Sequence, residues 1–186
     1  MHRSFRSVFR LWCIVYSSDK WLDPHYLLMT LARPPSVERT HQELLQFLIA
    51  VRRLPGKTGS CAEEVAKYLQ PHLDREDECE LPLLGLLQDL AAGTLTLAVA
   101  RQGSKVYARL KEEYPRMSAE HRELFKLIEQ LKTAGMEEGH LTAVRFAETM
   151  ERHAQDEEEL FYPAALLAGR LASERAEPRS ARSIRS

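Results

Sequence analysis

The feature that most constrains this chain is a histidine followed four residues later by a glutamate, which occurs twice. The pairs are His72 with Glu76 and His153 with Glu157. On a helix, residues at i and i+4 project from the same face about 6 Å apart along the axis, so each pair has the spacing of a chelate. Pro163, six residues after the second glutamate, predicts that the last helix ends there.

The residues around the two pairs correspond to each other at one constant offset. Both sets follow a 4-3-4-3 spacing, which is typical of the inward stripe of a bundle helix. Burying an ionised carboxylate without a partner is costly, so a cation is expected near each glutamate. The stripes are Val65, Leu69, His72, Glu76 and Cys79 in the first helix and Phe146, Met150, His153, Glu157 and Leu160 in the second.

Each pair is preceded by a helix that carries one histidine on its apolar face. His41 follows Pro35 by the same interval as His121 follows Pro115, so both prolines are expected to open helices. Folding the two halves antiparallel about a pseudo-twofold axis would bring four histidines and two carboxylates into one bundle core. Six such ligands suit two metal ions. The expected helix N-caps are Ser36, Ser60 and Ser118.

The composition predicts an all-α protein, because glycine is sparse and Leu, Ala, Glu, Arg and Lys are common. Three segments are expected: an N-terminal extension over residues 1–33, the helical domain over 34–169, and a disordered basic tail over 170–186. The extension has two interpretations. It is a docking segment, or the native chain starts at Met29 and the upstream residues come from a misplaced start.

Several function classes lack their signatures. The net charge of -1 gives no reason to expect nucleic acid or a membrane surface as a partner. The three cysteines, Cys13, Cys61 and Cys79, form no CxxC motif, which favours a reducing, cytoplasmic setting and a packing role for Cys79. Phosphate-loop, dinucleotide and nucleophile-elbow motifs are missing, so an enzyme outside metal chemistry is not expected.

A donor set of imidazole and carboxylate without thiolate favours iron or manganese, with zinc as a further candidate. Taken singly, each histidine has an ordinary alternative as a core residue bonded to a backbone carbonyl. The metal hypothesis rests on the whole set, since every member falls on an apolar stripe and recurs in register.

These motifs resemble the hemerythrin-like HHE cation-binding family over about residues 34–169. The resemblance implies an up-down-up-down antiparallel four-helix bundle with an internal two-fold repeat around a non-haem di-iron centre. It implies that His41 and His72 bind one iron, that His121 and His153 bind the other, and that two glutamates bridge them. The implied metal ligands are His41, His72, Glu76, His121, His153 and Glu157.

The chain departs from the oxygen-carrying hemerythrins at the position of their fifth histidine, and its second bridging acid is Glu157 where they have aspartate. Those proteins have a second histidine one turn after the third-helix ligand, and Phe125 stands there in this sequence. The missing histidine would leave an extra coordination position open to water, peroxide or another side chain, which argues against reversible oxygen carriage. Tyr68, one turn before His72, is either a core tyrosine or a further side chain that reaches the metals.

Three functions stay open on the sequence alone. The first is a di-iron protein that binds or reacts with oxygen, peroxide or nitric oxide, with redox turnover as one form of it. The second is a metal-dependent sensing or iron-binding module without turnover. The third is a helical bundle in which the repeats serve only packing.

Overall fold

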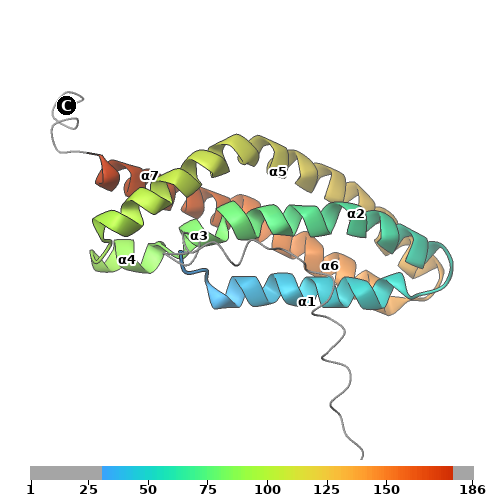
Figure 1. Cartoon of the computed structure of the whole chain (residues 1–186). Coiled ribbons are helices and arrows are strands. Elements are labelled where there is room, and N and C mark those ends of the chain that lie inside the picture. Colours follow the sequence, from blue (N-terminus) through green and yellow to red (C-terminus); the bar gives the residue numbers. More distant parts are fainter. Residues whose placement is uncertain (1–30, 178–186) are drawn as a thin grey trace, which may run out of the picture. The chain divides into compact units, whose positions relative to one another are not determined.

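The computed structural model describes residues 31–177, and every regular element in that range is helical. Long helices run side by side as a bundle (Figure 1). They are α1 (Pro35–Arg52), α2 (Gly56–Cys79), α5 (Leu97–Glu137) and the unbroken run of α6 (Leu141–Asp156), the π-helical η3 (Glu157–Phe161) and α7 (Tyr162–Ala176). Two short helices, α3 (Leu81–Leu84) and α4 (Leu87–Ala92), connect α2 to α5. The prediction of an all-α bundle is confirmed.

Apolar side chains fill the bundle as two clusters with a polar layer between them. On α2 the first cluster ends at Leu73 and the second begins at Cys79. On α5 the second cluster ends at Met117 and the first begins at Leu124. The predicted metal ligands lie in or beside these gaps, so apolar packing on both sides separates the polar layer from water.

Two prolines do not mark the helix boundaries that the sequence predicted. Pro115 lies inside α5, which begins at Leu97 behind the capping hydroxyl of Thr96. Pro163 lies in the first turn of α7, where a residue without an N–H is tolerated, and the helix continues to Ala176. The predictions of a helix start at Pro115 and a stop at Pro163 were wrong, because burial along α5 and α7 outweighs the local preference.

The prediction of a disordered tail from residue 170 was wrong over residues 170–176. Those residues belong to α7, which packs against α5 through small side chains. A Cβ on Gly169 would lie 2.5 Å from Cδ2 of Tyr107, which shows how closely the two helices approach. The remaining predicted tail, 178–186, and nearly all of the predicted extension, 1–30, lie outside the described residues.

The predicted N-caps were also wrong. Helix α1 begins at Pro35 and α2 at Gly56, upstream of Ser36 and Ser60, and Ser118 lies within α5. The N-terminus of α2 is capped by a distant side chain instead. Glu138, at the end of α5, accepts hydrogen bonds from the backbone N–H groups of Lys57 and Thr58 at 2.8 and 2.9 Å and from the Thr58 hydroxyl at 2.6 Å.

No helix in the described part of the chain is both long enough and apolar enough to cross a bilayer.

Candidate metal centre

The six side chains that the sequence singled out are buried together in the polar layer, and none is more than 6 % exposed. They come from every long helix of the bundle. His41 lies on α1, His72 and Glu76 on α2, and His121 on α5. The last two, His153 and Glu157, lie on α6 and at the first residue of η3.

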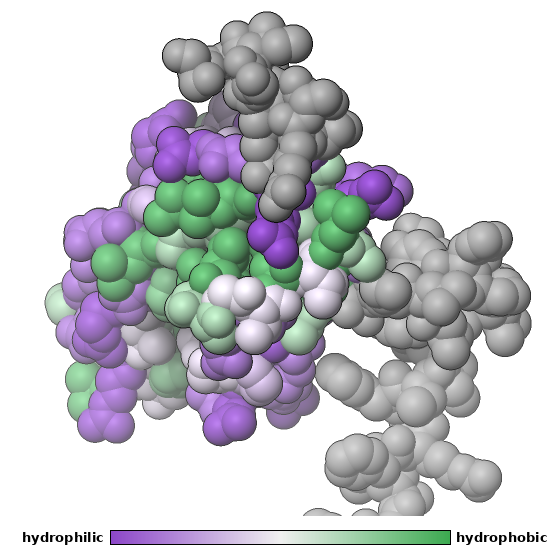
Figure 2. Space-filling model, turned by 90° about the vertical axis from the view of Figure 1, so that its left-hand side faces the viewer, coloured by the Kyte–Doolittle hydropathy of each residue, from purple (hydrophilic) through white to green (hydrophobic). Residues whose placement is uncertain are grey.

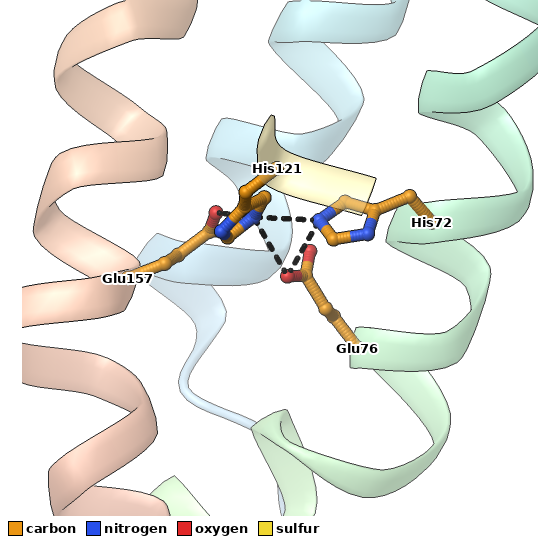
Figure 3. Close-up of side chains that lie close together, drawn as sticks. All are labelled: His72, Glu76, His121 and Glu157. Carbon is orange, nitrogen blue, oxygen red and sulfur yellow. Dashed lines mark hydrogen bonds and ion pairs between the residues drawn. The ribbon is translucent and has the colours of Figure 1, made fainter. Parts of the chain in front are cut away.

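His72, Glu76, His121 and Glu157 form a first group of donors (Figure 3). The Nε2 atoms of His72 and His121 face each other at 2.7 Å. Oε1 of Glu76 lies 3.0 Å from Nε2 of His72, and Oε2 of Glu157 lies 3.2 Å from Nε2 of His121. All four ligand atoms fall within 4.8 Å of one another, which is the spacing expected around a single ion.

His41, His153 and Glu157 form a second group. Oε1 of Glu157 lies 2.7 Å from Nε2 of His153 and 3.5 Å from Nε2 of His41. Oε2 of Glu76 lies 3.9 Å from Nε2 of His41, on the side away from His72. Each glutamate thus turns one oxygen toward each pair of histidines, which is the arrangement of a bridging carboxylate.

This grouping differs from the pairing that the family resemblance implied. His72 lies with His121, and His41 lies with His153, whereas the resemblance paired His41 with His72 and His121 with His153. The physical reason is the position of Glu157, whose two oxygens point to different helices, one to His153 and His41 and the other to His121.

The buried carboxylates of the site favour positive charge on the neighbouring histidines. Burial alone would lower the pKa of His41, but the hydrogen bond with Asp77, the contact with Glu157 and the charge of Glu76 raise it to about 10. The pKa of His72 is raised to about 9 against the same effect of burial, chiefly by Glu76. In the metal-free protein, protons on these imidazoles therefore supply the charge that a cation would supply.

The Glu157 carboxyl responds in the opposite sense. Its complete burial would raise its pKa, but contacts with three imidazoles hold the pKa well below the usual range, so Glu157 is ionised. The three imidazoles belong to His121, His153 and His41.

Ligand atoms without hydrogen bonds provide the test of whether a metal fits. Within residues 31–177, four buried atoms of the six side chains make no hydrogen bond of normal geometry, although Nε2 of His153 lies 2.7 Å from Oε1 of Glu157. Buried polar atoms are rarely left in that state. Ring nitrogens and carboxylate oxygens are the atoms that bind iron, manganese and zinc. The donor set therefore fits a metal centre. The four atoms are Nε2 of His41, Oε2 of Glu76, Nε2 of His153 and Oε1 of Glu157.

Sequence reasoning missed Tyr162, whose side chain is completely buried beside the first group. Its hydroxyl donates a hydrogen bond of 2.5 Å to Oε1 of Glu76, and its ring stacks on His121 with the centroids 5.5 Å apart. Burial beside Glu76 and Glu157 raises the pKa of this phenol, so it stays protonated.

The π-helical turn explains why the miss occurred. The backbone N–H of Tyr162 donates to the carbonyl of Glu157, five residues back, which adds one residue to the turn. Tyr162 therefore lies over Glu157, on the face that a regular helix would give to residue 161. Leu160, predicted to point inward, is 60 % exposed for the same reason.

Burial also decides the predicted roles of Tyr68 and Cys79. Tyr68 is 44 % exposed, so it is neither a core tyrosine nor a side chain that reaches the centre. Cys79 is buried in the second apolar cluster, and its thiol donates to the carbonyl of Arg75. Burial raises the pKa of this thiol to about 12, which agrees with the predicted packing role.

Glu80 is a second residue that the sequence did not single out. It is completely buried, and neither carboxylate oxygen has a hydrogen-bond partner within the described residues. Burial raises its pKa well above the usual value, and the charges of Glu76, Glu157 and Asp77 add to the effect. Burial and the neighbouring charges therefore favour the protonated form of Glu80 in the metal-free protein.

In a comparison with protein families, the chain matches the hemerythrin HHE cation binding domain over residues 35–165. The matched range contains all six side chains of the polar layer. Searches of curated proteins and of solved structures returned no match.

Proposed function

This chain belongs to the hemerythrin HHE cation-binding domain family, and we propose that it holds a dinuclear metal centre, with iron as the native metal. The observation that carries the proposal is the set of buried imidazole nitrogens and carboxylate oxygens that converge from separate helices, four of which make no hydrogen bond of normal geometry. The proposed ligands are His41, His72, Glu76, His121, His153 and Glu157.

The two groups of donors correspond to two ion positions. His72 and His121 would hold one ion, and His41 and His153 would hold the other. Glu76 and Glu157 would bridge them, because each presents one oxygen to each histidine pair.

Iron is the first choice because the donors are imidazoles and carboxylates. Cys79 supplies no thiolate, since its sulfur donates to a backbone carbonyl and packs 4.0 Å from the sulfur of Met117. Manganese and zinc accept the same donors and are the alternatives that metal analysis must distinguish.

We propose that the physiological ligand is a small molecule such as oxygen, peroxide or nitric oxide. A bound pair of iron ions would supply Lewis acidity and electrons for such a ligand. Apolar clusters on both sides of the polar layer exclude bulk water from it. The Tyr162 hydroxyl holds a proton against Glu76 and fixes the orientation of that carboxylate.

The proposed chain path is up-down-up-down with an internal two-fold repeat. Connections of a few residues join α1 to α2 and α5 to α6, and short connections favour antiparallel neighbours. The order of packing agrees, since α1 contacts α2 and α6, and α5 contacts the same two helices.

The test is the metal content and visible spectrum of protein purified under low oxygen. We expect about two irons per chain and an oxo-to-iron absorption band that changes when peroxide or oxygen is added. A colourless protein that takes up only zinc would refute the iron and redox part of the proposal.

A second candidate is a metal-dependent sensing module without turnover. It is favoured by the position of the ligands between two apolar clusters, because loading then couples directly to core stability. Its signature is a large fall in melting temperature on chelation, with no consumption of peroxide by the loaded protein.

A further inference from the structure

The imidazoles of the centre differ in what supports them from outside. In three of them the ring nitrogen that faces away from the centre lies against a carboxylate on a neighbouring helix. Nδ1 of His41 is 2.9 Å from Asp77, Nδ1 of His72 is 3.1 Å from Glu120, and Nδ1 of His121 is 2.9 Å from Glu158. Such a carboxylate fixes the tautomer and orientation of a metal-binding histidine and increases its basicity.

His153 lacks this support. Within residues 31–177 no carboxylate lies within 4 Å of its Nδ1, and it is the most exposed of the six side chains, at 6 %. Glu120, which supports His72, directly precedes His121 on α5. In the other half of the repeat, the position of Glu120 is taken by Thr40, which directly precedes His41 on α1. Thr40 has no carboxylate to offer His153, and its hydroxyl donates to the carbonyl of Ser36.

The two ion positions also differ in the number of donors. The first group offers four buried donors from four side chains, and both of its histidines are supported by carboxylates. The second group offers three donors, and only one of its two histidines is supported. Oε2 of Glu76 completes the second group only at 3.9 Å from His41.

We propose that the two positions bind metal with unequal affinity: the His72–His121 position fills first, and the His41–His153 position holds a weaker, exchangeable ion. Over a range of metal concentrations the protein then exists in a form that carries a single ion. The inference rests on the proposed metal binding. Loss of one outer partner typically lowers metal affinity about 10- to 100-fold, which sets the scale of the difference.

The first test is a titration of the metal-free full chain with Mn²⁺. Calorimetry and the electron paramagnetic resonance signal of the free ion measure the binding. We expect two resolved steps with affinities at least about tenfold apart. His153→Ala should abolish the weaker step and keep the tighter one, and His72→Ala should abolish the tighter one. Two ions bound with one affinity, or loss of the tighter step in His153→Ala, would overturn the inference. Absence of any binding would instead refute the proposed function.

The second test adds the missing carboxylate. Thr40→Glu should strengthen the weaker step by about 10- to 100-fold, while Thr40→Gln, which has the same size without the charge, should leave it unchanged. Conversely, Glu158→Gln should weaken the tighter step by a similar factor, with His121 left unsupported. Glu158 is the cleaner choice because Glu120 also pairs with Arg75 and Arg116. With helical content unchanged, a second step that Thr40→Glu does not strengthen would contradict the proposed cause of the difference.

Discussion

The hydroxyl of Tyr162 lies 2.5 Å from Oε1 of Glu76, and this hydrogen bond joins the start of α7 to α2 inside the polar layer. Because Tyr162 and Glu76 are both completely buried, water cannot replace this hydrogen bond if it is broken. Oε1 of Glu76 would then lose the donor that Tyr162 provides. The bond therefore links the packing of the second apolar cluster to the orientation of a proposed bridging ligand.

We expect Tyr162→Phe to lower the free energy of unfolding of the metal-free protein by about 1.5–3 kcal/mol, the usual contribution of a hydrogen bond to a charged group. Metal should reduce the loss, because an ion would satisfy the oxygen that Tyr162 leaves behind. Urea denaturation with and without chelator measures both effects. Tyr114→Phe is the control, since Tyr114 packs against the Tyr162 ring without contacting Glu76. Equal losses in the two variants would mean that the hydroxyl of Tyr162 has no particular role.

Glu80→Gln should stabilise the metal-free protein at neutral pH. Burial raises the folded-state pKa of Glu80 well above its usual value, so ionisation of the unfolded chain opposes folding once the pH exceeds about 4.5. Glutamine removes that penalty, and the gain should vanish near pH 4, where both states are protonated. Denaturation at the two pH values measures it. Glu78→Gln, at an exposed ion pair with Arg109, should change stability little at either pH. A gain that is the same at both pH values would contradict the assignment.

Glu138 should make stability depend on pH in the acid range. Its hydrogen bonds with Thr58 and Lys57 at the N-terminus of α2 lower its pKa to about 2. A lowered carboxyl pKa stabilises the fold above the unfolded value of 4.5, and that contribution is lost as the pH falls through about 2. Glu138→Gln should therefore be less stable than the parent at pH 7, with the difference shrinking in acid. Glu137→Gln is the control, because among residues 31–177 the contact of Glu137 is with the exposed ammonium of Lys57. A difference that persists unchanged in acid would rule out this account.

Metal binding should release protons. The pKa values of His41 and His72 are raised to about 10 and 9 in the metal-free protein, so both imidazoles are protonated at neutral pH and must lose a proton to bind an ion. The apparent affinity should therefore rise with pH until these values are reached. Calorimetry in buffers of different ionisation enthalpy counts the protons. Binding that is independent of pH between about 6 and 8 would show that metal does not displace protons from these imidazoles.

The sequence predicted the residues of the polar layer because helical spacing alone places His72 with Glu76 and His153 with Glu157 on buried stripes. It could not predict which histidines share a group. That depends on the side-chain rotamer of Glu157 and on how the helices pack, and neither leaves a periodic signal.

Tyr162 was missed and Leu160 was wrongly placed inward for a different reason. A π-turn shifts the helical register by one residue, and the spacing of apolar residues does not predict it. The burial of Glu80 could not be predicted, because the acidic run before it is typical of a solvent-exposed face. Pro115 and Pro163 signal helix ends locally, but the two apolar clusters hold the helices together across both prolines.

The most direct measurement is the number of metal ions bound per chain after purification under low oxygen, for the parent protein and for Glu157→Ala. Glu157 is the residue that belongs to both groups of donors, with one oxygen toward each. We predict about two ions in the parent and a marked loss from both positions in the variant. A parent chain without metal, or a variant that keeps both ions, would contradict a dinuclear centre built on these six side chains.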